Sequence, residues 1–117
     1  NMTAEALSQV IADAMDDKKA IDIVVMDLRN IKNTVSDFFV ICSANSDTQV
    51  EAIADSIEEK VSKAGEASPY RVEGKNNNQW VLIDYVDVVA HIFLKDKREF
   101  YGLEDLWGDA ILSKVHD

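Results

Sequence analysis

The stretch WVLIDYVDVVAHIFL, from Trp80 to Leu94, decides the fold because its residues favour extended backbone. It is rich in β-branched and aromatic side chains, which pack well on a pleated sheet. It is also longer than a typical strand of five or six residues. We therefore predict two strands joined by a turn around Val86 and Asp87.

Alternation along the first of these strands separates its side chains onto two faces of the sheet. One face receives Val81, Ile83 and Tyr85, and the other receives Trp80, Leu82 and Asp84. Because β-branched residues belong in a core, we expect Val81 and Ile83 to be buried. Trp80 and Asp84 are then candidates for the opposite, more exposed face.

Three more strands are predicted upstream. FFVIC, Phe38–Cys42, is too uniformly apolar for a strand with one solvated face, so we place it in the centre of the sheet. IDIVVMDL, Ile21–Leu28, is rich in β-branched residues. Tyr70–Glu73 is a short strand, and the polar segment 74–78 is a turn leading to Trp80.

Two amphipathic helices are predicted from apolar residues that repeat at helical spacing. Thr3 can cap a helix that ends near Lys18, and Ser46 begins a capping box whose helix ends at Gly65. Residues 96–115 are predicted to form one or two short helices. Together these elements predict an α/β (α+β) domain over residues 2–117, with one mixed sheet of about five strands and helices mainly on one face. The other face is expected to stay open.

Charge limits the partners that the chain can take. Asp and Glu number 22 against 12 Lys and Arg, a net charge of -10. Such a chain repels nucleic-acid phosphates and anionic membranes, so we expect no membrane binding and no direct sequence-specific nucleic-acid recognition. A basic protein is the more natural partner, although acidity also serves solubility. The sequence has neither a membrane-length apolar run nor a signal or transit peptide, which predicts a cytoplasmic protein.

The sequence offers little catalytic chemistry. No Asp or Glu is followed two positions later by another, so no strand carries a same-face carboxylate pair for a metal. A thiol enzyme would need Cys42 beside His91, and we interpret these as a buried hydrophobe and a hydrogen-bonded strand histidine. The four glycines form no phosphate-binding loop, and no Gly-x-Ser-x-Gly turn is present. We therefore predict a protein without cofactor or metal that is not an enzyme.

Aromatic residues concentrate in the C-terminal half instead, at Trp80, Tyr85, Phe93, Phe100, Tyr101 and Trp107. We expect Phe93, Phe100 and Trp107 to pack the last helix onto the sheet. Trp80 and Tyr85 flank a carboxylate beside a polar turn, and aromatic anchors near polar groups are typical of protein interfaces. The sequence therefore predicts a binding surface at the start of the strand pair.

Two blocks of sequence carry a family resemblance. The first comprises Gly74, Trp80, Asp84, His91, Phe93, Arg98, Phe100, Tyr101, Leu103, Glu104, Leu106, Trp107 and Ala110. The second is SDFFVICSANSDTQVEAIAD, Ser36–Asp55. Both resemble the ribosomal silencing factor (RsfS) family, also called Iojap-like proteins. One departure is Val86, at a position that is often glycine in the family.

The resemblance implies a bacterial repressor of translation. Such a factor binds the large ribosomal subunit through its ribosomal protein fourteen and blocks joining of the small subunit. It also implies a fold similar to the nucleotidyltransferase palm, without the paired acids of those enzymes. By position, the resemblance implies that the partner-binding residues are Trp80, Asp84, Tyr85, His91 and Tyr101. The alternatives are a nucleotide-handling enzyme that uses the palm-like sheet, and a homodimer formed through the open sheet face.

Overall fold

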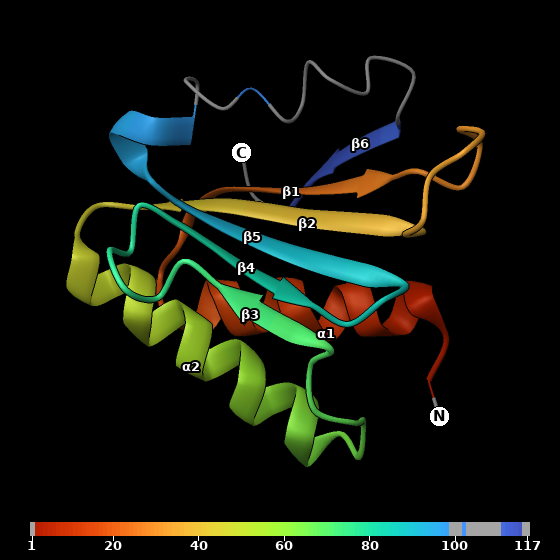
Figure 1. Cartoon of the computed structure of the whole chain (residues 1–117), viewed down its shortest axis with the longest axis horizontal. Coiled ribbons are helices and arrows are strands. Elements are labelled where there is room, and N and C mark those ends of the chain that lie inside the picture. The colour runs from red at the N-terminus through yellow and green to blue at the C-terminus, as the bar shows by residue number, and fades with distance from the viewer. Residues whose placement is uncertain (1, 99–101, 103–110, 116–117) are drawn as a thin grey trace.

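A mixed sheet of six strands carries two helices on one of its faces (Figure 1). The computed structural model describes residues 2–98, 102 and 111–115. The elements in chain order are α1 (Ala4–Asp17), β1 (Ile21–Asp27), β2 (Phe38–Ala44), α2 (Asp47–Lys63), β3 (Arg71–Glu73), β4 (Trp80–Asp84), β5 (Val88–Leu94), the 3-10 turn η1 (Lys95–Lys97) and β6 (Ile111–Lys114). This arrangement confirms the predicted fold class and the predicted order from α1 to β5.

The strand order in the sheet is β3-β4-β5-β2-β1-β6. The decisive stretch forms the β4–β5 hairpin, in which Trp80 lies opposite Phe93 and Leu82 lies opposite His91. β2 occupies an interior position, as predicted, and runs parallel to β5 and antiparallel to β1. Interior placement explains the uniformly apolar sequence of β2, because both of its faces are covered.

Both helices begin at the predicted caps. The Thr3 hydroxyl accepts the Ala6 N–H, and the Ser46 hydroxyl accepts the Gln49 N–H at 3.2 Å. The Gln49 side chain, in turn, accepts the backbone N–H of Asn45 at 2.7 Å. None of the helices in the described ranges has the length and apolarity needed to cross a membrane.

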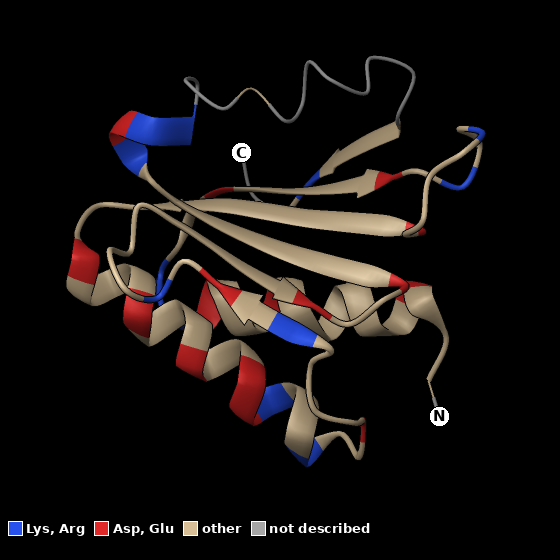
Figure 2. Ribbon diagram, in the orientation of Figure 1, with Lys and Arg blue, Asp and Glu red and all other residues tan. Residues whose placement is uncertain are grey.

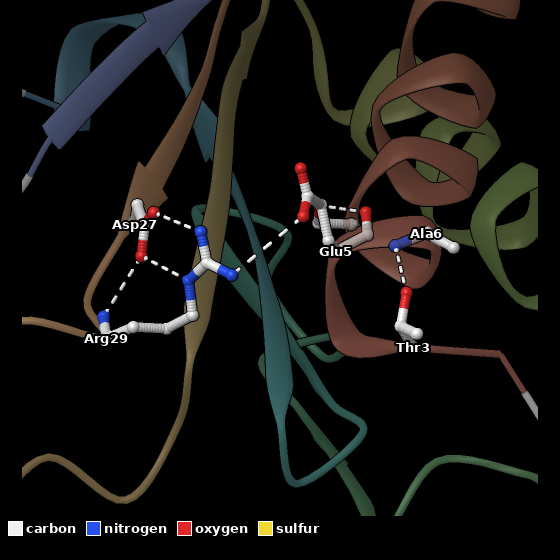
Figure 3. A network of polar contacts seen from close by, with 6 residues as sticks. Thr3, Glu5, Ala6, Asp27 and Arg29 are labelled. Carbon is white, nitrogen blue, oxygen red and sulfur yellow. Dashed lines mark hydrogen bonds and ion pairs between the residues drawn. The ribbon is translucent and has the colours of Figure 1, made fainter.

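A charged network ties the start of α1 to the end of β1 (Figure 3). The Arg29 guanidinium holds Asp27 through two hydrogen bonds of 2.7 and 3.0 Å, and reaches Glu5 at 3.8 Å. Its hydrogen bond to Asp27 lowers the pKa of that carboxyl group. The guanidinium also lies over the ring of Phe38, 4.9 Å from its centroid. The network therefore links the N-terminal turn of α1 to the C-terminal end of β1.

Each face of the sheet has its own apolar cluster. Val81 and Ile83 are fully buried beneath the helices, as predicted. The opposite face carries a second cluster of buried side chains, namely Val24, Met26, Leu28, Ile41 and Phe93. The expectation of an open face is therefore wrong for these residues, which are almost completely buried. On this face, the side chains of Trp80, Phe39 and Leu82 remain partly exposed.

The C-terminal segment differs from the prediction of one or two helices over 96–115. Lys95–Lys97 forms only a 3-10 turn, and Ile111–Lys114 forms β6, which pairs antiparallel with β1. β6 pairs with backbone groups of β1 and itself becomes the edge strand of the sheet. Phe100 and Trp107, which we expected in the core, lie outside the described residues.

The turn between β4 and β5 places a β-branched residue in a strained conformation. Val86 has φ 76°, and the Asp87 N–H donates to the Tyr85 carbonyl at 3.0 Å, which defines a three-residue γ-turn. Two contacts fix this geometry: the Asp84 carboxylate accepts the Val86 N–H at 2.7 Å, and the Ser36 hydroxyl donates to the Val86 carbonyl at 2.9 Å. A positive φ of this kind favours glycine, so Val86 is held in a conformation that its side chain disfavours.

Replacing Val86 with glycine should therefore stabilise the protein. A side chain in the left-handed region costs about 1–2 kcal/mol, and glycine loses about 0.5–1 kcal/mol through chain entropy. Val86→Gly should raise the free energy of unfolding by roughly 0.5–1 kcal/mol in urea titrations. Val35→Gly is the matched control, since Val35 is also exposed (88%) and is not among the residues with positive φ. Equal losses of stability in the two variants would contradict the assignment of strain.

Candidate functional site

Four aromatic rings gather on the sheet face away from the helices, and we call them the aromatic cluster: Phe39, Trp80, His91 and Phe93. They come from the neighbouring strands β2, β4 and β5. Trp80 stacks on Phe93 with ring centroids 5.0 Å apart, and Phe39 meets His91 edge-on at 4.7 Å. Such offset and edge-to-face contacts are favourable beyond simple area burial. The cluster therefore gives Trp80 a fixed support.

His91 holds the indole of Trp80 by a hydrogen bond. The Trp80 Nε1–H donates to His91 Nδ1 at 3.0 Å, so the imidazole must be neutral and carry its proton on Nε2. Burial lowers the pKa of His91 to about 3, and the nearby charge of Asp84 opposes this only weakly. Only 3% of His91 is exposed. His91 was predicted to bind the partner, and the structure places it buried beneath Trp80, in hydrogen-bond contact with the indole.

Asp84 organises the end of the hairpin. One carboxylate oxygen accepts the Val86 N–H, and the other accepts from Arg71 Nε at 3.2 Å. Arg71 also pairs with Glu73, and these carboxylates raise the pKa of its guanidinium, Asp84 first among them. The side chain of Asp84 is 16% exposed. Asp84 therefore shares the face of Trp80, with both of its carboxylate oxygens engaged within the chain.

Tyr85 lies on the other face of the sheet. It packs against the helix-side cluster, and its hydroxyl is buried without a hydrogen-bond partner among the described residues. Burial, with a smaller contribution from the charge of Glu58, raises the pKa of Tyr85 to about 12. The structure thus brings together Trp80, Asp84 and His91 and separates Tyr85 from them. Tyr101, the fifth predicted site residue, lies outside the described residues.

Three neighbouring side chains of this face are partly exposed, Phe39, Trp80 and Leu82, and we call them the candidate surface. Phe39 and Leu82 are half-buried, and their neighbours across the strands are Val89 and His91. Sequence reasoning missed Phe39 because alternation within β2 does not reveal which strand lies beside it. It also missed Arg71, whose pairing with Asp84 depends on the register of β3.

The arrangement does not form the thiol–imidazole pair of a cysteine enzyme. In the parallel β2–β5 register, Ile41 lies beside His91 and Cys42 lies beside Ile92, so Cys42 and His91 point to opposite faces. Complete burial also raises the pKa of the Cys42 thiol. Among the residues described, no three His, Cys, Asp or Glu side chains come together as a metal site.

Comparison with known proteins identifies the family. The family described as "Ribosomal silencing factor during starvation" matches residues 1–117. A Ribosomal silencing factor RsfS from Bacillus subtilis is 44% identical over 114 residues, which cover 97% of this chain and 95% of that protein. This chain therefore belongs to the ribosomal silencing factor family.

Two further comparisons agree. The crystal structure of a protein from Chromobacterium violaceum superimposes with a TM-score of 0.86 at 30% identity, covering 99% of this chain and 95% of that one. A mouse protein named "Mitochondrial assembly of ribosomal large subunit protein 1" is 32% identical over 74 residues, 62% of this chain and 32% of its own length. The fold and the resemblance to RsfS proteins are thus confirmed.

The neutral, buried state of His91 predicts a pH dependence of stability. Its pKa is about 3 in the folded chain against 6.5 ordinarily, so between these values only the unfolded chain binds the proton. The contribution of His91 to the free energy of unfolding is fully present above pH 6.5. It is lost as the pH falls toward the folded pKa of about 3. Between pH 7 and pH 5, the free energy of unfolding of the parent should fall by about 2 kcal/mol more than that of His91→Gln. The glutamine keeps an acceptor for the indole and does not titrate. Urea unfolding at both pH values measures the difference, and parallel losses would show that His91 is accessible to protons in the fold.

Proposed function

We propose that this chain silences translation in the bacterial cytoplasm by binding the large ribosomal subunit through its ribosomal protein fourteen. The bound factor then blocks joining of the small subunit. Membership of the ribosomal silencing factor family supports a ribosomal target. The name of the mouse relative supports the choice of the large subunit over the small one.

The observation that carries the proposal is the half-buried Trp80, held by contacts with His91 and Phe93. Interfaces derive most of their binding energy from a few anchors, and tryptophan is prominent among them. Binding also costs less when an anchor is already ordered, because little side-chain freedom is lost. His91 and Phe93 order the indole before any partner arrives. The candidate surface therefore presents a pre-organised aromatic anchor to a protein partner.

The distribution of charge supports a basic partner. Figure 2 shows Asp and Glu along α2 and at the ends of several strands, in keeping with the net charge of -10. An acidic factor is attracted to a basic ribosomal protein at long range, which raises the association rate more than the affinity. The mechanism of silencing requires only occupancy. The molecule measures 35 × 33 × 27 Å, and a body of that size on the joining face would exclude the small subunit.

Gradient centrifugation of separated bacterial subunits tests this function. With increasing factor, we expect the protein to sediment with the large subunit and the whole-ribosome peak to fall until large-subunit binding saturates. Excess small subunit should partly restore that peak, since the two ligands exclude each other from one state. An undiminished whole-ribosome peak despite saturated binding would show that the blocking mechanism is wrong.

Trp80→Ala should weaken binding to the large subunit by about thirtyfold, or roughly 2 kcal/mol, because the anchor is removed. Phe38→Ala is the control, since Phe38 is a buried aromatic residue of the helix-side cluster and its loss lowers stability without changing the candidate surface. Binding is measured by cosedimentation at a temperature where both variants are folded. If Phe38→Ala weakened binding as much as Trp80→Ala, the effect would reflect stability and not contact.

A further inference from the structure

A short basic segment follows β5 at the end of the hairpin that carries Trp80. It contains two lysines of η1, Lys95 and Lys97, which we call the basic turn. Trp80 lies opposite Phe93 in the hairpin and stacks on its ring. Because β5 ends at Leu94, the basic turn begins close in the chain to the ring that supports Trp80.

The contacts of Arg98 place this segment on the face of the sheet that carries the candidate surface. The Arg98 guanidinium donates to the Ser43 hydroxyl at 3.0 Å and to the Asp22 carbonyl at 2.6 Å. Ser43 follows Cys42 along β2, and Cys42 belongs to the helix-side cluster, so Ser43 points away from the helices. In Figure 1, η1 likewise rises on the side of the sheet away from the helices. Arg98 therefore fixes the chain directly after the basic turn.

Both lysines of the basic turn are available to a partner. Lys95 is exposed and Lys97 is half-buried. Among the described residues, neither lysine forms an ion pair, whereas Lys63 and Lys75 pair with carboxylates of α2. Asp96 lies between the two lysines, so the three residues of η1 carry one net positive charge within an acidic chain (Figure 2).

This positive charge does not suit the basic ribosomal protein that the rest of the chain would attract, because like charges repel. A ribosomal subunit also presents the phosphates of its RNA, and the compact ammonium group of lysine binds phosphate well. The net charge of -10 opposes RNA binding at long range. A phosphate contact by the basic turn therefore needs a neighbouring protein contact to hold the chain against the subunit.

We propose that the basic turn contacts backbone phosphates of ribosomal RNA at the edge of the protein site on the large subunit. Trp80 contacts the protein partner, and Lys95 and Lys97 contact phosphates beside it. Phosphate contacts position a protein without reading the bases, so no sequence-specific recognition is involved. The inference rests on the proposed function and adds RNA as a second component of the same binding site.

Removing single charges tests the inference in large-subunit cosedimentation, because protein and RNA predict opposite signs. Lys95→Gln and Lys97→Gln should each weaken binding about five- to eightfold at about 0.1 M salt, and lessen the salt dependence of log affinity by about 0.7–0.9. Asp96→Asn should strengthen binding, since it removes a charge that repels phosphate. Lys63→Gln, a matched loss of charge on α2, should bind like the parent. Unchanged or tighter binding by both variants of the basic turn would overturn the inference and leave the proposed function standing.

Binding to isolated ribosomal protein fourteen separates the two proposals. This target carries no phosphate, so Lys95→Gln and Lys97→Gln should bind it at least as tightly as the parent, whereas Trp80→Ala should lose affinity for it. Equal losses by the lysine variants on the isolated protein and on the subunit would overturn the RNA contact. If the parent fails to bind the isolated protein while subunit binding still depends on the lysines, the proposed partner is wrong and the RNA contact stands.

Cross-linking distinguishes RNA from an acidic protein as the group that meets the basic turn. A photoreactive phenylalanine is placed at Asp96, between the two lysines, and the variant is illuminated with purified large subunits. We expect a cross-link to ribosomal RNA, which primer extension locates as a stop that is absent without illumination. A product that contains protein and no RNA would overturn the inference.

Discussion

The parallel pairing of β2 with β5 is the constraint on which the rest of the structure depends. Seven residues of each strand are aligned, from Phe38 beside Val88 to Ala44 beside Leu94. This pairing joins the N-terminal β1–β2 pair to the β3–β4–β5 meander, so that one helix layer covers both. It also sets Ile41 beside His91 and brings the Phe39 ring against the same imidazole. Without it, the aromatic cluster would lack its β2 side.

The β4–β5 hairpin carries Trp80, the residue that we propose to contact the partner. On one face, Trp80 rests on Phe93 and donates to His91, whose burial keeps the imidazole neutral and able to accept. On the other face, Tyr85 packs against the helix-side cluster. Asp84 lies between them and ties the hairpin to Arg71 and to the strained turn. The hairpin thereby supports Trp80 on one face and packs against the helix-side cluster on the other.

Local sequence patterns correctly predicted the features that depend only on residues close together in the sequence. Alternation correctly placed Val81 and Ile83 in the core and Trp80 on the opposite face, and the caps at Thr3 and Ser46 mark where the helices begin. It did not predict β6, because four residues pair with β1 only when the sheet edge is in place. Nor did it show that His91 is buried, since that depends on the rings that neighbouring strands bring to it.

Site-specific cross-linking tests the central claim most directly, that the candidate surface faces the large subunit. A photoreactive phenylalanine is placed at Leu82, which is half-buried beside Trp80, and in a control at Glu51, which is exposed on α2. After illumination with purified large subunits, the Leu82 probe should yield one main product that contains ribosomal protein fourteen, and the Glu51 probe should not. A product with that protein from Glu51 alone would contradict the account.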